Sequence, residues 1–296
     1  MKKSYIIIVH YGDPQVTLSC LKSLSGVGNK IPVIVLNNNS APLSDAITSL
    51  PQVTVVNCTE NLGFAKANNE GIKIALKRQA ENIILLNNDT LVSPDLISEL
   101  ISFAENNGQI GLVSPKIYFA EGHEFHKKRY RPKDLGKVIW YAGGLIDWKN
   151  IYAAHVGVDE VDHGQFDKVS STDFATGCCM LIKRKVLEKI GLFDENYFLY
   201  FEDVDYSQRA IQAGFQVFFN PQVFLWHKNA AASFGPGSVL HQYYQTRNRL
   251  YFGFKYASLR TKSALIKESF KHLLTDKLKR KAVLGYYFHQ MGKGKP

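Results

Sequence analysis

The sequence has few cysteines, no long apolar run and no leader-like amino terminus. Even its longest uninterrupted apolar runs are short, such as Tyr5 to Val9. They are far below the ~20 residues that a membrane-spanning helix needs. The first residues have neither the longer apolar region nor the small-residue cleavage site of a secretory signal. The four cysteines show no C-x-x-C spacing, which argues against a zinc site and a disulfide framework. These absences predict a cytoplasmic protein whose cysteines are reduced and serve as packing residues.

Common nucleotide-binding signatures are missing as well. The turn after the first predicted strand reads His10-Tyr11-Gly12-Asp13-Pro14, in place of the G-x-G-x-x-G of dinucleotide-dependent oxidoreductases. A P-loop is absent, and so is the glycine-rich basic loop that a sugar-nucleotide pyrophosphorylase would need at this turn. The sequence therefore disfavours all of these enzyme classes.

The composition is that of a folded protein with an uneven distribution of charge. The chain has 296 residues, of which 45% are hydrophobic and 21% charged, close to the average of globular proteins. Its net charge of +10 is concentrated at the end, where thirteen basic residues from Arg247 onward oppose only Glu268 and Asp276. Such asymmetry predicts contact with a polyanionic surface. The basic segment carries no nucleic-acid recognition motif, so a membrane is favoured over a nucleic acid.

Strand and helix signals alternate over the first 115 residues. Asp13 and Pro14 supply an N-cap and a first-turn proline for a helix that follows the first strand. Such alternation predicts an α/β fold with a mostly parallel sheet, in which ligands bind at the carboxyl ends of the strands. The predicted strands are 5–9, 32–36, 53–56, 82–86 and 110–114. One further helix is predicted at 63–76, and another begins after the cap Ser93-Pro94-Asp95 and ends near residue 104.

The pattern changes in the second half. Residues 120–170 indicate a loop-rich insertion, after which a strand is predicted within 174–183 and helices at 184–190 and 206–213. Beyond Arg247, apolar residues repeat at helical spacing with lysines on the other face, which predicts a basic amphipathic tail. We therefore expect one domain over 1–250, with halves 1–115 and 116–250, and a helical tail over 251–296. The apolar residues of this tail are Ile266, Phe270, Leu273, Leu274 and Leu278.

Two acidic motifs could carry chemistry. Asp89, in Asn87-Asn88-Asp89, directly follows a buried strand and suits a hard cation such as Mg²⁺ or Mn²⁺, although the same run could simply cap the next helix. Glu202-Asp203-Val204-Asp205 follows an aromatic run. Like charges beside aromatic rings raise one another's pKa, which produces a usable general base, although acids also suit a helix amino terminus. His227 could complete a cation site with Asp89 or could be a packed residue.

Amides and glycines follow the other predicted strands. Asn37-Asn38-Asn39-Ser40 ends the second strand, and Asn61-Leu62-Gly63 leads into a helix that contains Lys66 and Asn68. Amides at strand ends can read the edge of a nucleobase, and glycine lets the backbone approach a ligand. Ordinary turn chemistry explains the same residues, since turns prefer asparagine and glycine.

Taken in order, these motifs resemble those of the family 2 inverting glycosyltransferases. The resemblance covers residues 4 to about 250 and also includes Gly177 to Met180, Phe193-Asp194-Glu195, Arg209 and Arg247-Asn248. It is closest to the rhamnosyltransferase-like branch that builds bacterial surface polysaccharides. The resemblance implies a GT-A fold, with a Rossmann-like mixed sheet that a nucleotide-sugar-binding half and an acceptor-binding half share.

The resemblance also implies roles for individual residues. Asp203 matches the catalytic base and Glu202 its neighbour. Asp89 would hold a metal ion, Mg²⁺ or Mn²⁺, and His227 matches a contact to the metal or to the diphosphate. Lys66 and Arg247 would approach the diphosphate of the donor. Asn87 and Asn88 occupy the D-x-D position in which only Asp89 keeps a carboxylate. The expected nucleotide-sugar contacts are His10, Tyr11, Asn37, Asn39, Lys66, Asn68, Asn87 and Asn88.

The implied activity is inverting transfer of a sugar from a nucleotide diphosphate to a hydroxyl of a glycan or lipid-linked acceptor. Rhamnose on dTDP is the first expectation for the donor, followed by UDP-galactose and UDP-N-acetylhexosamine. The basic tail would place the enzyme at the inner face of the plasma membrane, unless its apolar stripe packs on the body or on a second subunit. The alternative function is a degenerate nucleotide-sugar or glycan-binding protein of the same fold, because Asn37 and Asn87 replace carboxylates.

Overall fold

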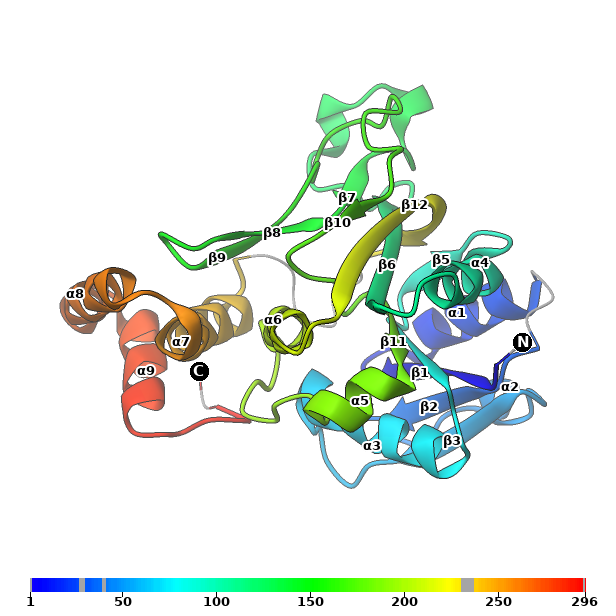
Figure 1. Cartoon of the computed structure of the whole chain (residues 1–296), viewed down its shortest axis with the longest axis horizontal. Coiled ribbons are helices and arrows are strands. Elements are labelled where there is room, and N and C mark those ends of the chain that lie inside the picture. The colour runs from blue at the N-terminus through cyan, green and yellow to red at the C-terminus, as the bar shows by residue number, and fades with distance from the viewer. Residues whose placement is uncertain (1, 27–29, 39–40, 230–236, 295) are drawn as a thin grey trace.

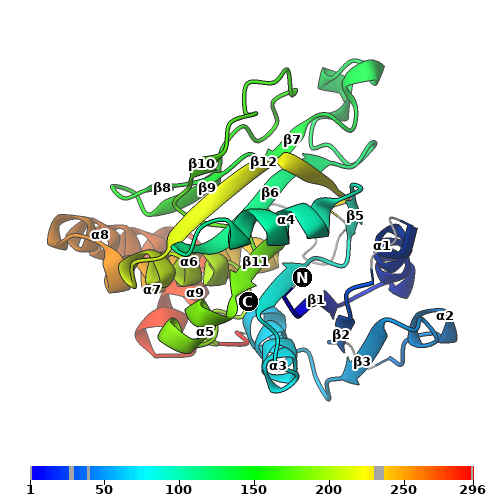
Figure 2. The same cartoon turned by 45° about the vertical axis from the view of Figure 1, so that its right-hand side comes forward.

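The structure is a computed structural model that describes residues 2–26, 30–38, 41–229, 237–294 and 296. A central sheet has helices on both faces, and the last helices gather at one side of it (Figures 1 and 2). The main path of the sheet has the order β10-β12-β6-β11-β4-β1-β2-β3, and β5 and β7 pair with β12 and β6. The mixed α/β architecture that the resemblance implies is confirmed. The mostly parallel sheet predicted from the alternation of strands and helices is wrong for the second half, where antiparallel pairs predominate.

The first half of the sheet is parallel. β1 pairs in parallel with both β2 and β4, and β2 pairs in parallel with β3. The helix after β1 begins at Pro14, as the Asp13-Pro14 pair predicts. The elements of this half are β1 (Ser4–His10), α1 (Pro14–Gly26), β2 (Val33–Asn37), α2 (Asp45–Thr48), β3 (Val53–Asn57), α3 (Gly63–Lys77) and β4 (Asn82–Leu86).

The second half introduces antiparallel pairs. β11 lies antiparallel between β4 and β6, while β12 runs parallel to β6 and antiparallel to β5. The short strand β5 was not predicted, because three residues carry too little pattern to indicate a strand. The elements of this half are β5 (Thr90–Val92), α4 (Leu96–Glu105), β6 (Ile110–Phe119), β11 (Cys179–Lys183), α5 (Arg184–Ile190), α6 (Glu202–Gln212) and β12 (Gln216–His227).

The insertion between β6 and β11 contains more regular structure than its sequence predicts. Lys116 on β6 fixes it to the sheet, because its buried Nζ lies 2.7 Å from Asp162 Oδ2 and 2.6 Å from Asp167 Oδ1. The insertion forms the upper part of Figure 1. Its elements are the 3₁₀ turns η1 (Lys127–Arg129) and η2 (Pro132–Asp134), β7 (Ile139–Tyr141), the hairpin β8 (Gly144–Asp147) with β9 (Tyr152–His155), and β10 (Ser170–Ser171).

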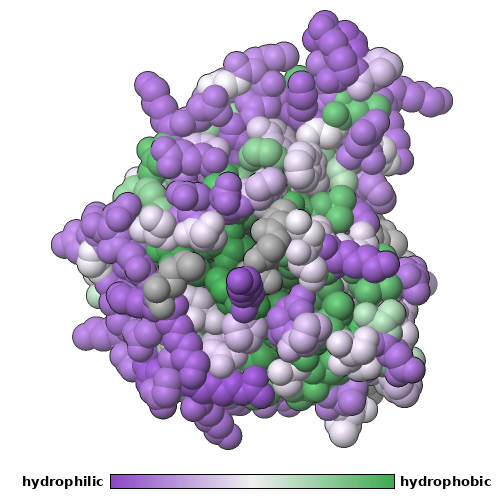
Figure 3. All heavy atoms as spheres, turned by 90° about the vertical axis from the view of Figure 1, so that its right-hand side faces the viewer, coloured by the Kyte–Doolittle hydropathy of each residue, from purple (hydrophilic) through white to green (hydrophobic). Residues whose placement is uncertain are grey.

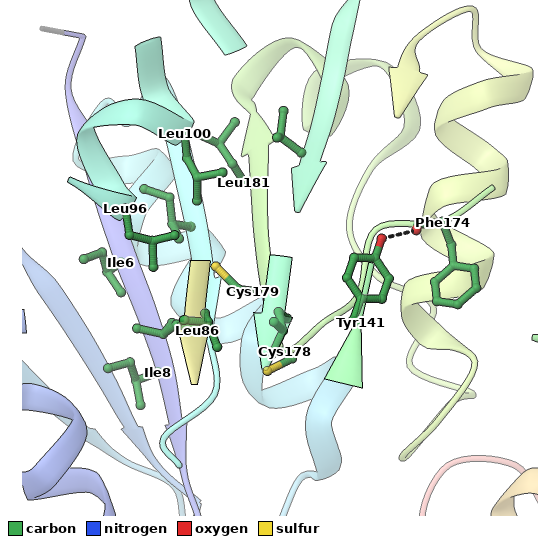
Figure 4. Close-up of a cluster of buried hydrophobic side chains, with 14 of the residues drawn as sticks. Ile6, Ile8, Leu86, Leu96, Leu100, Tyr141, Phe174, Cys178, Cys179 and Leu181 are labelled. Carbon is green, nitrogen blue, oxygen red and sulfur yellow. Dashed lines mark hydrogen bonds between the residues drawn. The ribbon is translucent and has the colours of Figure 1, made fainter. Parts of the chain in front are cut away.

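The core lies on both faces of the sheet. Side chains of β1 alternate, so Ile6 and Ile8 join one buried cluster while Ile7 joins the other. Figure 4 shows the first cluster, in which Leu96 and Leu100 of α4 contribute. The buried Cys178 and Cys179 lie in this cluster as free thiols, and burial raises the pKa of both. Cys20, Cys178 and Cys179 thus serve as packing residues, as the sequence predicts, whereas Cys58 is half-buried.

The chain ends in α7 (Val239–Tyr256), α8 (Leu259–Thr275) and α9 (Lys277–Tyr287). Helix α7 runs through residue 250, where the sequence suggested a boundary, and it is tied to α6 by the fully buried Asp205. The Asp205 carboxylate lies 2.9 Å from Arg209 Nε, 2.7 Å from Lys255 Nζ and 2.8 Å from the Tyr256 hydroxyl. The predicted apolar stripe is divided: Leu273 and Leu278 pack against the body, whereas Ile266, Phe270 and Leu274 are exposed.

Candidate active site

A carboxylate and an imidazole meet at the end of β4. After this strand the chain turns through Asn87 and Asn88 into β5, which pairs with the end of β12 so that Thr90 lies opposite His227. The N–H of Lys228 donates to the Asp89 carbonyl at 2.8 Å and continues this pairing. Main-chain pairing therefore brings His227 Nε2 to 3.0 Å from Asp89 Oδ1. The two residues are only 5% and 6% exposed.

This pair has the donor chemistry of a divalent-cation site. Carboxylate oxygen and imidazole nitrogen both suit Mn²⁺, and Mg²⁺ accepts the carboxylate. The Nδ1 atom of His227 is buried and has no hydrogen-bond partner among the described residues, while the Trp140 ring packs against the imidazole at 4.6 Å. No cluster of three possible ligands occurs in the part of the chain that the structure describes. Phosphate oxygens and water would therefore have to complete the shell of a bound ion.

The acidic pair Glu202–Asp203 opens α6 after a strained stretch of backbone. Tyr200 and Phe201 have φ values of 69° and 72°, a left-handed conformation that costs energy in non-glycine residues and is often found at functional sites. The Gly177 N–H donates to Asp203 Oδ2 at 2.9 Å, and the Val204 N–H donates to Oδ1 at 2.9 Å. Asp203 is thus held by main-chain donors on both of its oxygens.

The carboxyl groups of Glu202 and Asp203 differ in how strongly each holds a proton. Desolvation raises the pKa of both, and the neighbouring Asp203 charge helps to raise that of Glu202 well above its usual range. Hydrogen bonds from main-chain N–H groups favour the charged form of Asp203, whereas Oε2 of Glu202 is buried without a partner among the described residues. We therefore assign the proton of the pair to Glu202 and the negative charge to Asp203.

A single segment, Gly177–Cys178, connects the two acidic sites. The Asn87 N–H donates to the Cys178 carbonyl at 2.9 Å, and the preceding Gly177 N–H binds Asp203. The charges of both Asp89 and Asp203 add to burial in raising the pKa of the Cys178 thiol. Gly177 is needed here, because a Cβ at this position would lie 2.9 Å from the Phe64 ring. Asp89, His227 and Asp203 are thus gathered around the same end of the sheet.

Several expected nucleotide-sugar contacts lie near this end of the sheet. His10 is buried beside Thr17, with 2.7 Å between His10 Nδ1 and Thr17 Oγ1, and burial lowers its pKa. Thr17 also accepts from Asn88 Nδ2 at 2.9 Å. Tyr11 is 40% exposed and accessible to a ligand. Asn37 donates from Nδ2 to the carbonyl of Ala41 and to Asn57 Oδ1, at 2.8 and 2.9 Å.

Other expected contacts are placed differently. Lys66 is exposed near the start of α3, but the buried Asn68 donates to the Phe64 carbonyl of the same helix at 3.0 Å. Asn39 lies outside the described residues. Arg247 is fully buried and donates to the main-chain carbonyls of Asn196 and Gln290 at 3.3 and 3.1 Å. The expectation that Arg247 approaches a diphosphate is therefore wrong, because its guanidinium is used inside the protein.

Sequence reasoning missed an aromatic wall beside His227. Trp140 of β7 lies between His227 and His155 of β9, with ring centres 4.6 and 4.3 Å apart. Desolvation, with a smaller effect from His227, lowers the pKa of His155 to about 4. Tyr141 bonds the Phe174 carbonyl at 2.7 Å, as Figure 4 shows. The apolar run Ile139–Tyr141 before two glycines was the available signal for a strand in this insertion.

Asn248 of α7, which the sequence names in a motif without assigning it a role, holds the loop before the acidic pair. Its Nδ2 donates to the carbonyls of Leu199 and Tyr200, both at 2.9 Å, and its Oδ1 accepts from Arg247 Nε at 3.0 Å. Asn248 is fully buried. The strained turn that presents Glu202 and Asp203 is therefore fixed from α7.

Comparison with known proteins gives the following relatives. Residues 3–253 match the family model described as "Glycosyltransferase like family 2". The chain is 25% identical over 206 residues to the low-salt glycan biosynthesis hexosyltransferase Agl10 of Haloferax volcanii, and it covers 60% of that protein with 69% of its own length. It is 25% identical over 251 residues to the dTDP-rhamnosyl transferase RfbF of Shigella flexneri, with 82% of the chain and 77% of the relative covered. A Mycobacterium tuberculosis N-acetylglucosaminyl-diphospho-decaprenol L-rhamnosyltransferase is 23% identical over 227 residues, with 73% of each chain covered.

Solved structures of glycosyltransferases share the fold. GalNAc-T7 with UDP, GalNAc and Mn²⁺ superposes with a TM-score of 0.60 at 14% identity, over 96% of this chain and 58% of that one. The mannosyltransferase PcManGT from Pyrobaculum calidifontis, in complex with GDP-Man and Mn²⁺, gives a TM-score of 0.55 at 15% identity, over 99% and 76%. The expected GT-A fold is confirmed. Among the described helices, none is long and apolar enough to cross a bilayer.

Proposed function

The chain belongs to the glycosyltransferase-like family 2, and from this premise we propose that it transfers a sugar from a nucleotide diphosphate to an acceptor hydroxyl with inversion at the anomeric carbon. One observation carries the proposal: the Gly177–Cys178 segment is bonded both to Asp203 and to the turn that carries Asp89, which is paired with His227. The Asp89–His227 pair can hold a cation for the leaving group. Asp203 can accept a proton from the attacking group.

Asp89 and His227 would hold Mg²⁺ or Mn²⁺. The ion would supply neutralisation of the diphosphate as it leaves the sugar. We keep His10, Tyr11, Asn37, Asn87 and Asn88, which follow strands at this end of the sheet, as the nucleotide contacts; of these, Tyr11 is exposed, while His10, Asn37 and Asn88 are buried. The exposed Lys66 can reach toward the diphosphate from α3, whereas Asn68 is occupied within its helix and contributes through packing. Asn39 stays a predicted contact to the nucleotide sugar.

Asp203 would take the proton of the acceptor hydroxyl as its oxygen attacks the face of the sugar opposite the diphosphate. Two main-chain N–H groups hold this carboxylate in place and favour its charged form against the desolvation that raises its pKa. Glu202 keeps the proton of the pair and is neutral, so it does not compete with Asp203 for the proton of the acceptor. Because one base suffices for this single displacement, no covalent sugar intermediate is needed.

We propose rhamnose on dTDP as the donor and a glycan or lipid-linked saccharide as the acceptor. The names of two relatives support this choice, since one is a dTDP-rhamnosyl transferase and the other transfers L-rhamnose in a decaprenol-linked context. UDP-linked sugars are the next candidates. A lipid-linked acceptor would place the enzyme at the inner face of the plasma membrane, which the basic carboxyl-terminal segment favours.

A panel of nucleotide sugars tests the proposal. The purified chain is mixed with dTDP-rhamnose, UDP-galactose or UDP-N-acetylglucosamine, with and without Mn²⁺, and Tm and product are measured. A true donor at one hundred times its Kd should stabilise the fold by about 2.7 kcal/mol, and Mn²⁺ should increase the effect. If no nucleotide sugar raises Tm under either condition, the proposal is wrong.

A binding protein without turnover is the second candidate. It is favoured by the replacement of two carboxylates that the family pattern expects, one by Asn87 in the D-x-D position and one by Asn37. The same panel separates the two functions. A donor that raises Tm without hydrolysis of its sugar or transfer to any acceptor would support binding alone.

Asn248→Ala should lower kcat with little change in donor binding. The substitution removes the two hydrogen bonds that Asn248 Nδ2 donates to the Leu199 and Tyr200 carbonyls. Each lost hydrogen bond costs about 0.5–1.5 kcal/mol, so we expect a loss of roughly tenfold in kcat as Asp203 loses its fixed position. Steady-state kinetics and the Tm shift with donor are the measurements.

Gln242→Ala on the same helix is the matched control, because Gln242 is not linked to the loop and donates to the Gly237 carbonyl. It should leave kcat unchanged. An Asn248→Ala enzyme with the kcat of the wild type would show that this amide is structural only.

A further inference from the structure

We propose that the exposed face of α8 docks on an anionic lipid bilayer. The proposal deepens the location suggested under the proposed function, but it stands on a different part of the molecule and can be tested without any transfer assay. Helix α8 lies at the outer edge of the protein in two views, far from the amino-terminal half of the sheet (Figures 1 and 2).

The face is an apolar stripe that the protein leaves uncovered. At 100° per residue, Leu259, Ile266, Phe270 and Leu274 fall on one side of α8 within about 80° of arc. Leu259, Phe270 and Leu274 are 83%, 63% and 81% exposed. The opposite side carries the buried Thr261, Leu265 and Ser269, which face the body. The helix is therefore packed through one side and open on the other.

The charges around the stripe define the partner. Arg260, Lys267 and Lys271 are exposed along one edge of the stripe. The acidic residue of the helix, Glu268, is turned toward the body, where Arg249 holds both of its oxygens at 2.9 Å. The open side thus combines large apolar side chains with cations and the small polar Ser263, and it carries no acidic residue of α8. This is the pattern of a helix that lies in the headgroup layer of an anionic membrane.

The helix is fixed firmly enough to dock as a part of the enzyme. Besides the Arg249–Glu268 pair, Arg280 Nε donates to the Leu273 carbonyl at 2.6 Å at the far end of α8. Leu265 packs so closely on Gly253 of α7 that a Cβ there would lie 2.4 Å from its Cδ1. A membrane bound to α8 would therefore hold α7, and the loop that Asn248 fixes, at a constant distance from the lipid surface.

Uncovered apolar side chains of this size usually mark an interaction site. The amino-terminal side of the molecule, which Figure 3 turns toward the viewer, carries many hydrophilic side chains around its rim. An acidic protein surface would fit the cations of α8. A bilayer fits both the cations and the length of the stripe, from the first turn of α8 to its last.

Flotation with lipid vesicles tests the proposal on the full chain. Vesicles of phosphatidylcholine alone and of phosphatidylcholine with phosphatidylglycerol are compared. Wild type should float with the anionic vesicles and much less with the neutral ones. Phe270→Ser with Leu274→Ser should lower the partition coefficient at least ~10-fold, because two large apolar side chains no longer enter the lipid. Lys267→Gln with Lys271→Gln should lower it further by about fivefold per charge removed.

Val158→Ser with Val169→Ser is the matched control, since both valines are exposed apolar residues of the insertion. This variant should float like the wild type. Equal flotation of the wild type and the Phe270/Leu274 variant, or no flotation of the wild type, would overturn the proposal and leave an acidic protein as the partner. Because Tm shifts with nucleotide sugars need no vesicles, failure of the proposed transferase function would be seen separately.

Discussion

Asp203→Asn is expected to reduce sugar transfer by about 10³-fold or more while the fold stays intact. General base catalysis contributes about 10²–10⁴-fold, and the amide cannot take up the proton of the acceptor. The asparagine has the same shape, and its Oδ1 can still accept one of the two main-chain N–H groups that Asp203 accepts. Product formation at saturating donor is the measurement, and the Tm shift with donor should stay close to that of the wild type.

Asp205→Asn provides the contrast, because Asp205 lies two residues away but is bonded to Arg209, Lys255 and Tyr256. Removing one partner of buried charges costs about 3 kcal/mol. We therefore expect a large fall in Tm for this variant and nearly normal turnover per folded molecule. If Asp203→Asn retained more than a few percent of transfer, another group would have to be the base.

The pH dependence of the wild type follows from the same carboxylate. Desolvation raises the folded-state pKa of Asp203 above its usual value, and transfer requires its charged form. The rate should therefore fall as the pH decreases through this raised pKa. The acid limb of kcat against pH should lie above the value of about 3.9 for an unperturbed aspartate.

Asp89→Asn is expected to lose the response to Mn²⁺ and to lower transfer by roughly 100-fold. An amide can still accept the hydrogen bond from His227 Nε2, so the local structure is kept, but the negative charge that attracts the cation is gone. The measurement is the Tm of the nucleotide-bound protein during titration with Mn²⁺, with transfer as the second readout.

Asn87→Asp is the variant expected to act in the opposite direction. It restores a second carboxylate to the D-x-D position, two residues before Asp89, and should shift the Mn²⁺ titration to lower concentrations. An Asp89→Asn protein that still responds to Mn²⁺ like the wild type would show that the cation binds elsewhere.

The pairing of Asp89 with His227 illustrates how far the sequence could predict this site. Asp89 comes shortly after β4, whose five residues are all buried and have an easily recognised apolar pattern. His227 taken alone has the same pattern as any packed histidine. What joins them is the pairing of β5 with β12, and a three-residue strand forms through its partner and not through a pattern of its own.

The conformation of the loop before Asp203 and the aromatic wall beside His227 could not be predicted from the sequence, because they too depend on contacts between distant segments. Tyr200 and Phe201 are ordinary residues in an unusual backbone conformation, which the Asn248 amide stabilises from a helix almost fifty residues later. Trp140 and His155 come from an insertion whose strands β7 and β9 hold only three and four residues. Contacts of this kind depend on where distant segments pack, and local spacing does not encode that position.

The sequence by itself determined the local elements of this protein and the chemistry they carry. Asp13 and Pro14 start α1, the strands of the first half follow their apolar runs, and the basic residues after Arg247 give the last helices their charge. Only the tertiary structure decided which side of α8 is covered. Helical periodicity places Leu265 and Phe270 on different faces, but packing against Gly253 buries the first and leaves the second in solvent. The physical reason is that burial is a property of two surfaces, and the sequence of one helix describes only one of them.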